Sequence, residues 1–339
     1  MKNWQDTPTR DLRLEKGETE HARSIAGYES LERGVALVDL SGRTLLRLTG
    51  KDPIGMLNAI LTNHVPKEAL GTYAALLNPK GRIQTDLRVL KMNGDVLIDT
   101  ELAGAQAARE ILDRYAPFSR VELEDLSQGE ATWAILGLYG PRAGELLGDL
   151  RLAEHESAPV EVGGTALLVA GVAVPVPGFD LLGPTESLRV AREHLAEAGA
   201  IPADYDSYQA ARVAACVPRF GSDITPENFP AEAGILERAV SFEKGCYPGQ
   251  ETVARMRYRG HPNKTLHRLA LEGHLPDPGT PIVQDGRQVG KITSVAPLPI
   301  KGRRLALGYL SRNARTEAPL SAGEATVLLA PEGVIENDS

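Results

Sequence analysis

The stretch KGCYPGQE at residues 244–251 carries the densest set of structural signals in the chain. It places Cys246, one of only two cysteines, among two glycines and a proline. Glycine adopts backbone conformations that other residues avoid, and proline fixes its own φ, so the stretch predicts a tight turn around the thiol. We expect a helix to begin directly after this turn, at Gln250 and Glu251.

The residues that follow the turn are strongly basic. Residues 244–268 contain six lysines and arginines and a single acid, Glu251. Nearby cations and a helix N-terminus both favour the thiolate form of a cysteine, so a reactive Cys246 is one interpretation. The other is a small buried residue in a glycine-rich turn, since cysteine is among the most buried residue types. The nearest imidazoles, His261 and His267, do not suggest a Cys/His catalytic pair.

Composition narrows the class of protein. The chain has 339 residues, 42% of them hydrophobic and 24% charged, with a net charge of −8, which predicts a globular protein of two or three domains. The acidic balance argues against dedicated nucleic-acid binding. The longest apolar run, residues 166–174, is too short to span a membrane, and the N-terminus has no apolar signal segment, so we expect a cytoplasmic protein.

Several common site types lack their usual evidence. With Cys216 as the only other cysteine, a disulfide framework or a thiolate-built metal or iron–sulfur site is excluded. Cys216 lies in an apolar helical stretch and is predicted to be core. The chain contains no P-loop, dinucleotide-binding, zinc-protease or serine-hydrolase motif.

Hairpin and helix signals alternate through the first 264 residues and indicate an α+β fold rather than a doubly wound parallel sheet. Asp52 followed by Pro53 marks a helix start, and Asn93-Gly94 marks a hairpin. After residue 265 short strands alternate with Pro/Gly turns, which predicts a small C-terminal β-barrel. We expect strands at residues 35–40, 44–49, 73–78, 83–92, 95–100, 121–126, 132–140 and 160–176, helices at 19–33, 52–61, 103–115, 187–198 and a short one from Pro141, and a loose arm at 1–18.

The stretch at 244–251 resembles the signature of the YgfZ-type folate-binding proteins, within the superfamily of the glycine-cleavage T-protein, an aminomethyltransferase. LTGKD at 48–52, LNPKGR at 77–82 and VGKITS at 289–294 are similar to other motifs of that superfamily. The similarity covers roughly residues 25–330.

The resemblance implies a three-domain ring with tetrahydrofolate in a central hole. Residues 1–264 would form two subdomains, 20–50 with 130–264 and 51–129, and residues 265–339 the barrel. It also implies a role in assembly or repair of iron–sulfur enzymes, with client enzymes or assembly factors as partners. Cys246 would be the functional thiol, facing the folate cavity.

The resemblance further implies individual site residues. Asp86 matches an aspartate that works beside the reactive folate nitrogen, where it could hold a proton, although its position in a strand also allows it to face solvent. Arg212 matches a folate-contacting or structurally paired arginine. Four further residues are expected to contact the folate: Asn78, Lys244, Tyr247 and Gln250.

The chain departs from the T-protein pattern at two glutamates, one of which pairs with the pterin ring. Val174 and neighbouring prolines stand at that place, and valine cannot accept the pterin N–H groups. This weakens the first alternative, an aminomethyltransferase of glycine cleavage. Two others remain open: a folate-dependent tRNA-modification factor, and an interaction module whose basic turn docks an acidic partner.

Overall fold

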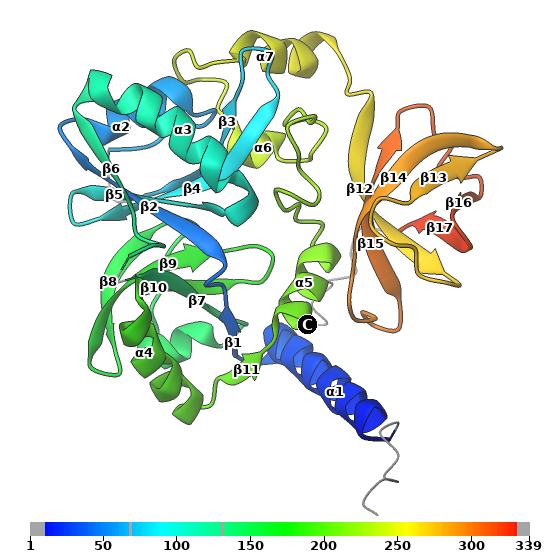
Figure 1. Ribbon diagram of the computed structural model, residues 1–339, viewed down its shortest axis with the longest axis horizontal. Helices are drawn as coiled ribbons and strands as arrows, with labels where there is room; N and C mark the ends of the chain where they lie inside the picture. The colour runs from blue at the N-terminus through cyan, green and yellow to red at the C-terminus, as the bar shows by residue number, and fades with distance from the viewer. Residues whose placement is uncertain (1–10, 68–69, 130–131, 331–339) are drawn as a thin grey trace, which may run out of the picture.

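The computed structural model describes residues 11–67, 70–129 and 132–330. Figure 1 shows three lobes, two built on sheets and one on a barrel, around an irregular central segment at residues 215–249. All sheet pairings within these residues are antiparallel except that of β1 (Ala36–Asp39) with β11 (Ile201–Ala203). The α+β class is therefore confirmed.

The first lobe is a five-stranded sheet with two helices on one face. The strand order is β3-β4-β5-β2-β6. Asp52 accepts a hydrogen bond from the Gly55 amide at 2.9 Å and caps the first helix, as predicted. The elements are β2 (Arg43–Gly50), α2 (Pro53–Ile60), β3 (Thr72–Leu77), β4 (Ile83–Met92), β5 (Asp95–Glu101), α3 (Leu102–Ser119) and β6 (Val121–Asp125).

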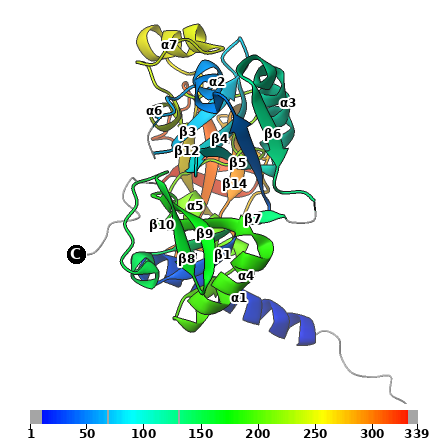
Figure 2. The ribbon, with the colours of Figure 1, turned by 90° about the vertical axis from the view of Figure 1, so that its left-hand side faces the viewer.

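The second lobe is a six-stranded sheet in the order β11-β1-β7-β10-β9-β8. Figure 2 shows the two sheet lobes stacked one above the other. Alternate residues explain this arrangement: Leu46 packs under α2 and α3, whereas Leu45 packs against the second sheet. The elements are β7 (Trp133–Tyr139), the short η1 (Ala143–Leu147), β8 (Ser157–Val162), β9 (Thr165–Val172), β10 (Gly178–Pro184) and α4 (Thr185–Glu197), together with β1 and β11.

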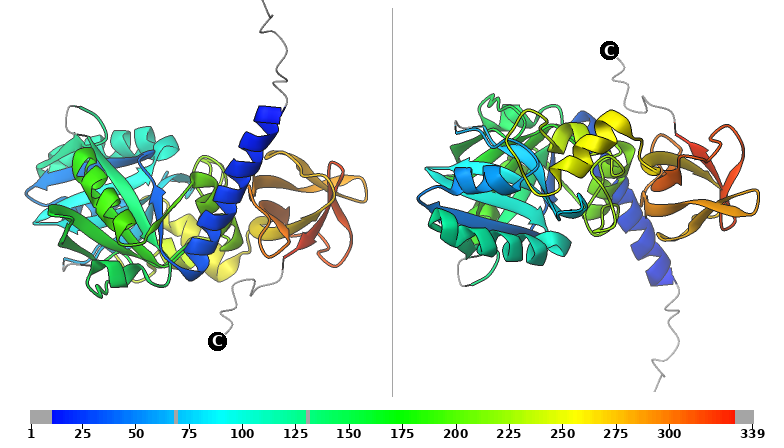
Figure 3. Two further views of the ribbon diagram at one scale, coloured as in Figure 1. Left: turned by 90° about the horizontal axis from the view of Figure 1, so that it is seen from below. Right: turned by 90° about the horizontal axis from the view of Figure 1, so that it is seen from above.

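The third lobe is a closed six-stranded barrel, which confirms the predicted C-terminal barrel. It stands at the end of the molecule opposite the two sheets (Figure 3). Its core is a separate apolar cluster that includes Leu269, Ile292 and Leu310. Its strands are β12 (Lys264–Glu272), β13 (Pro281–Gln284), β14 (Arg287–Val295), β15 (Arg304–Ser311), β16 (Leu320–Ala322) and β17 (Ala325–Leu329).

Four helices lie outside the three lobes. α1 (Asp11–Arg33) packs on β11 and on α5 (Tyr205–Ala214), and it projects away from the body of the molecule (Figure 3). The central segment then carries the one-turn α6 (Leu236–Ala239). The helix predicted after the glycine turn is α7 (Gln250–Arg259), which leads from the first lobe to the barrel (Figure 1).

The structure differs from the sequence-based expectation in three places. β1 belongs to the second sheet and β2 to the first. The subdomain boundary proposed at residue 50 therefore falls after a strand that belongs with 51–129. Residues 160–176 contain parts of two strands joined at Gly163-Gly164, and α1 begins within the expected arm, of which residues 1–10 lie outside the described residues.

Candidate functional site

A polar cavity of about 110 Å³ lies where the two sheet lobes meet the central segment. We call it the central cavity. Its walls come from β2, β3, β4 and β5 of the first lobe, from β7, β9, β10 and the loops at 154–155 and 174–175 of the second, and from α5, α6 and the segment around residues 217–220. Four carboxylates and four arginines line it: Asp86, Glu101, Glu154, Asp180, Arg43, Arg88, Arg219 and Arg238. Such a density of charge in an enclosed space indicates a binding site rather than core.

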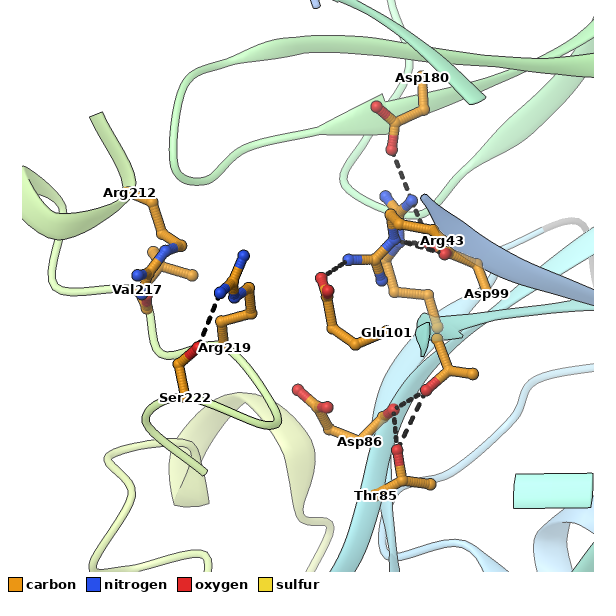
Figure 4. A network of polar contacts seen from close by, with 12 residues as sticks. Arg43, Thr85, Asp86, Asp99, Glu101, Asp180, Arg212, Val217, Arg219 and Ser222 are labelled. Carbon is orange, nitrogen blue, oxygen red and sulfur yellow. Dashed lines mark hydrogen bonds and ion pairs between the residues drawn. The ribbon is translucent and has the colours of Figure 1, made fainter. Parts of the chain in front are cut away.

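Asp86 stands out among these carboxylates. It is buried, and it accepts a hydrogen bond from the Tyr73 hydroxyl at 2.6 Å, but no ion pair within the described residues includes it. Burial is the main influence on the carboxyl and raises its pKa, against the opposing effect of the Tyr73 hydrogen bond. Figure 4 shows the carboxyl group directed into the open space that Arg219 borders from the other side. Asp86 can therefore accept or hold a proton at a bound ligand.

The neighbouring carboxylates are, by contrast, neutralised. Asp99 is fully buried and accepts hydrogen bonds from Arg43 and Arg88, both at 2.6 Å. Burial opposes ionisation of Asp99, yet the two guanidinium groups outweigh it and hold its pKa below the usual value. Arg88 also pairs with Asp180 of the second sheet, whose other oxygen accepts from Tyr139. The network thus fixes the two sheets to each other at the cavity wall.

His155 adds a neutral group to the cavity. Burial, helped by the positive charges of Arg88 and Arg238, lowers the pKa of this imidazole to about 3. Its Nδ1 is buried and has no hydrogen-bond partner in the described part of the chain. The Tyr73 ring lies 6.5 Å from the imidazole, centroid to centroid. The cavity therefore offers an unionised ring nitrogen beside the buried Asp86–Tyr73 pair.

The sequence motif at 244–251 lies behind the site rather than in it. The Tyr247 ring is buried in a cluster with Leu77, Ile83 and Ile235, and Ile235 also lines the central cavity. Lys244 donates to the carbonyls of Asn58 and Leu61, both at 2.8 Å, and lies over the Tyr247 ring. Burial lowers the pKa of the Lys244 amine to about 8. These contacts support the wall formed by β3 and β4.

Asn78 and the glycines of the motif form a close contact between two turns. The Asn78 side chain accepts from the amides of Lys80 and Arg82, at 2.9 and 3.1 Å, and so shapes the β3–β4 turn. Gly249 has φ +81°, and a Cβ added there would lie 2.7 Å from the Asn78 carbonyl oxygen and 2.7 Å from the Gly81 Cα. The motif needs glycine here because side-chain atoms would separate the two turns.

Replacing Gly249 by alanine is expected to lower the free energy of unfolding by about 1–3 kcal/mol, because the added methyl clashes with backbone atoms. Gly245 is the matched control within the same motif, since a Cβ there meets nothing within 4 Å. Urea unfolding followed by circular dichroism measures both. Equal midpoints for the two variants would contradict the predicted contact between the turns.

Gln250 and Arg212 also lie outside the residues that line the central cavity. Gln250 is the first residue of α7. Arg212 is buried and pairs with Asp223 at 2.6 Å, and it donates to Ser294 of the barrel at 2.9 Å. The structure thus shows a paired arginine that fixes α5 to the barrel, and direct contact of Arg212, Asn78, Lys244, Tyr247 or Gln250 with a folate stays a prediction.

Cys246 is exposed and is not one of the residues that line the central cavity. The expectation that this thiol faces the folate cavity therefore differs from the structure, because Tyr247, its neighbour in the turn, takes the buried position. Of the basic residues of the segment, Lys244 lies in the turn itself, and the other five lie in α7 and β12. Arg255 pairs with Glu251 and Arg257 with Glu237, so these cations do not form one positive shell around the sulfur.

Asp86 was expected from the sequence, but the groups around it in the cavity were not. These are Tyr73, Glu101, His155, Asp180, Arg43, Arg88, Arg219 and Arg238. The sequence does contain one indication of this charged network. Asp99 and Glu101 interrupt an otherwise apolar strand, and acids buried in a sheet are tolerated only if they are paired.

Within the described residues, no group of three or more His, Cys, Asp or Glu side chains is arranged to hold a metal ion, and none of the helices has the length and apolarity to cross a membrane.

Comparison with known proteins agrees with this architecture. The three-lobed fold is that of an aminomethyltransferase: the crystal structure of the glycine cleavage system aminomethyltransferase T from Bartonella henselae superposes with a TM-score of 0.80 at 19% identity, covering 92% of this chain and 90% of that one. Residues 9–244 match the family described as GCVT N-terminal domain, and the chain belongs to that family. Residues 263–334 match the CAF17 C-terminal beta-barrel domain.

Two curated relatives illustrate the range of similar sequences. A putative chloroplastic transferase of Arabidopsis thaliana, At1g60990, is 27% identical over 84% of this chain and 67% of its own length. An aminomethyltransferase of Thermus thermophilus is 28% identical over 86% of this chain and 83% of its own length.

Proposed function

We propose that this protein is a tetrahydrofolate-binding protein of the YgfZ type that assists assembly or repair of iron–sulfur enzymes. The observation that carries the folate part is Asp86, a buried carboxylate with no ion-pair partner among the described residues, in a cavity whose other lining acids are paired with arginines. Burying such a charge costs free energy unless a ligand compensates it. A reduced pterin supplies a basic ring nitrogen and N–H donors that Asp86 can engage.

Several side chains of the central cavity would each contribute to folate binding. Asp86 would hold a proton at the amine nitrogen of the reduced ring, and Tyr73 would fix the carboxyl group in place through its 2.6 Å hydrogen bond. The neutral His155 could donate or accept at the ring edge without bringing a further charge into the cavity. Glu101, which Arg43 holds in the wall, offers a second carboxylate for N–H donors of the ligand.

The exposed Cys246 supports the second part of the proposal, because its thiol is open to a partner protein. The CAF17-type barrel likewise supports a YgfZ-type protein over an aminomethyltransferase. In cells that lack the protein, a Cys246→Ser chain is expected to fail to restore the activity of iron–sulfur enzymes. A Cys216→Ser chain is the matched control and should restore it. Restoration by both variants would show that the Cys246 thiol is not required for this activity.

Alkylation distinguishes the two thiols directly. Iodoacetamide is expected to modify Cys246 at least about tenfold faster than Cys216, because Cys246 is exposed whereas burial raises the pKa of the Cys216 thiol. Tetrahydrofolate should not slow modification of Cys246, since this residue does not line the central cavity. Mass spectrometry of the two peptides measures both rates. Strong protection of Cys246 by tetrahydrofolate would show that the thiol and the ligand share one site.

The second candidate is an aminomethyltransferase, which is the name carried by several relatives of similar length. Against it, Val174 and Pro175 line the central cavity at the place where the T-protein pattern has a glutamate. Purified protein, an aminomethyl-lipoyl carrier and tetrahydrofolate would release ammonia if this candidate were correct. We expect no release.

A further inference from the structure

One side of helix α3 carries a row of side chains that reaches the surface of the first lobe. Their spacing of three and four residues places them on the same side of the helix, and we call them the α3 stripe: Ala107, Glu110, Ile111, Arg114 and Phe118. Figures 1 and 2 show α3 on the outside of the first lobe, with no other lobe lying over it. Phe118 is 85% exposed. Single exposed apolar side chains are ordinary on protein surfaces, so the meaning of Phe118 depends on what lies beside it.

A cavity of about 230 Å³ lies beside the α3 stripe, between this helix and the β3–β4 turn. It shares no lining residue with the central cavity, and its exposed residues Pro79, Glu110 and Arg114 place its mouth at the surface. Most of its lining is apolar: Ile60, Leu76, Leu77, Pro79, Ala107, Ile111, Tyr115 and Pro248. An apolar cavity of about 150 Å³ holds a benzene molecule, so this one has room for the ring of a phenylalanine.

The mouth of this cavity carries two opposite charges that do not pair with each other. Glu110 and Arg114 are four residues apart, a spacing at which an ion pair can form within a helix. Neither takes part in an ion pair of the described residues, whereas Arg109, on another side of α3, pairs with Asp113. Glu110 accepts a hydrogen bond only from the neutral Gln106 amide, at 2.9 Å, among the described groups. Both charges are therefore available to a partner across an interface.

We propose that the α3 stripe is a dimer interface, in which α3 packs antiparallel against α3 of a second copy of this chain. A two-fold axis that crosses α3 near residue 112 places Glu110 of each copy opposite Arg114 of the other. The same axis places Phe118 opposite Gln106, beside the cavity wall at Ala107, where its ring can enter the cavity. The helix thus supplies a base for the acid, an acid for the base and a ring for the cavity. This self-complementarity identifies the occupant as a second copy.

Sedimentation velocity of the full chain tests the proposal. An interface built on one pair of helices is smaller than the standard size, so the dimer should be weak and should form as the concentration is raised from about 1 to 100 µM. Phe118→Ser is expected to weaken dimerisation at least about 30-fold, the effect of removing one central side chain of an interface. Leu102→Ser is the matched control and should leave dimerisation unchanged, because Leu102 is 70% exposed on the same helix but lies outside the stripe.

Charge reversal tests the two-fold arrangement itself. Arg114→Glu alone should weaken dimerisation about tenfold, because Glu110 of the other copy would then face a like charge. Adding Glu110→Arg to the same chain should restore it, because the same pairs then form with their signs exchanged. Both positions are exposed, and a melting curve checks that each variant is folded. A parent protein that stays monomeric over this range, a dimer that Phe118→Ser leaves intact, or a double variant no better than Arg114→Glu would each overturn the proposal.

Discussion

Replacing Arg88 by methionine is expected to lower the free energy of unfolding by about 3–5 kcal/mol, because a buried carboxylate would lose its partner. The Arg88 side chain is 13% exposed and pairs with Asp99 of the first sheet and with Asp180 of the second. Asp99 would keep Arg43, but Asp180 would have no ion-pair partner left among the described residues. Urea unfolding followed by circular dichroism measures the change.

Two further variants separate the ion pair from general effects of the substitution. Arg189→Met removes an exposed arginine that pairs with Glu186 and Glu193, and it should leave the unfolding midpoint unchanged. Adding Asp180→Leu to the Arg88 variant should recover part of the loss, because the uncompensated charge is then removed. An Arg88 variant as stable as the parent would mean that the network does not hold the two sheets together.

Replacing Asp86 by asparagine is expected to weaken tetrahydrofolate binding about 10–100-fold, the range for losing a hydrogen bond to a charged group. The amide oxygen can still accept the Tyr73 hydrogen bond, so the shape of the cavity is preserved. Stability should remain the same or rise, because a buried carboxylate without an ion-pair partner is replaced by a neutral group. Calorimetric titration and a thermal melt of the same sample give both quantities.

The pH dependence gives an independent reading of Asp86. Burial raises the pKa of its carboxyl group, so the charge is lost at a higher pH than it is for an exposed aspartate. Affinity for tetrahydrofolate should therefore fall earlier as the pH is lowered, and this dependence should disappear in the Asp86→Asn protein. Asp113→Asn, at an exposed position of α3, is the control and should bind as the parent does. Unchanged affinity for tetrahydrofolate in the Asp86→Asn protein would show that Asp86 does not contact the ligand.

Part of the charged network can be predicted from the sequence by counting residues outward from the Asn93-Gly94 hairpin turn. Asn93 and Gly94 both have positive φ, 48° and 93°, as the predicted two-residue turn requires. The turn pairs Met92 with Asp95, and counting outward from it places Arg88 opposite Asp99. The Arg88–Asp99 ion pair is therefore determined by local turn chemistry and hairpin register.

The Arg88–Asp180 ion pair could not be predicted in this way. Asp180 comes from the second sheet, and its contact with Arg88 depends on how the two sheets pack. The orientation of Asp86 was ambiguous for a related reason: the first sheet is covered on both faces, so alternation along β4 does not distinguish core from solvent. Likewise the helix start at Gln250 was predicted correctly, whereas the outward position of Cys246 depends on the packing of Tyr247 against distant residues.

The most direct test of the folate site is a crystal structure of the protein with tetrahydrofolate bound. We expect the pterin ring in the central cavity, with a ring nitrogen within hydrogen-bond distance of the Asp86 carboxyl group, about 2.6–3.2 Å. A pterin bound elsewhere, such as beside Cys246 on the surface, with Asp86 facing only the Tyr73 hydroxyl, would contradict it.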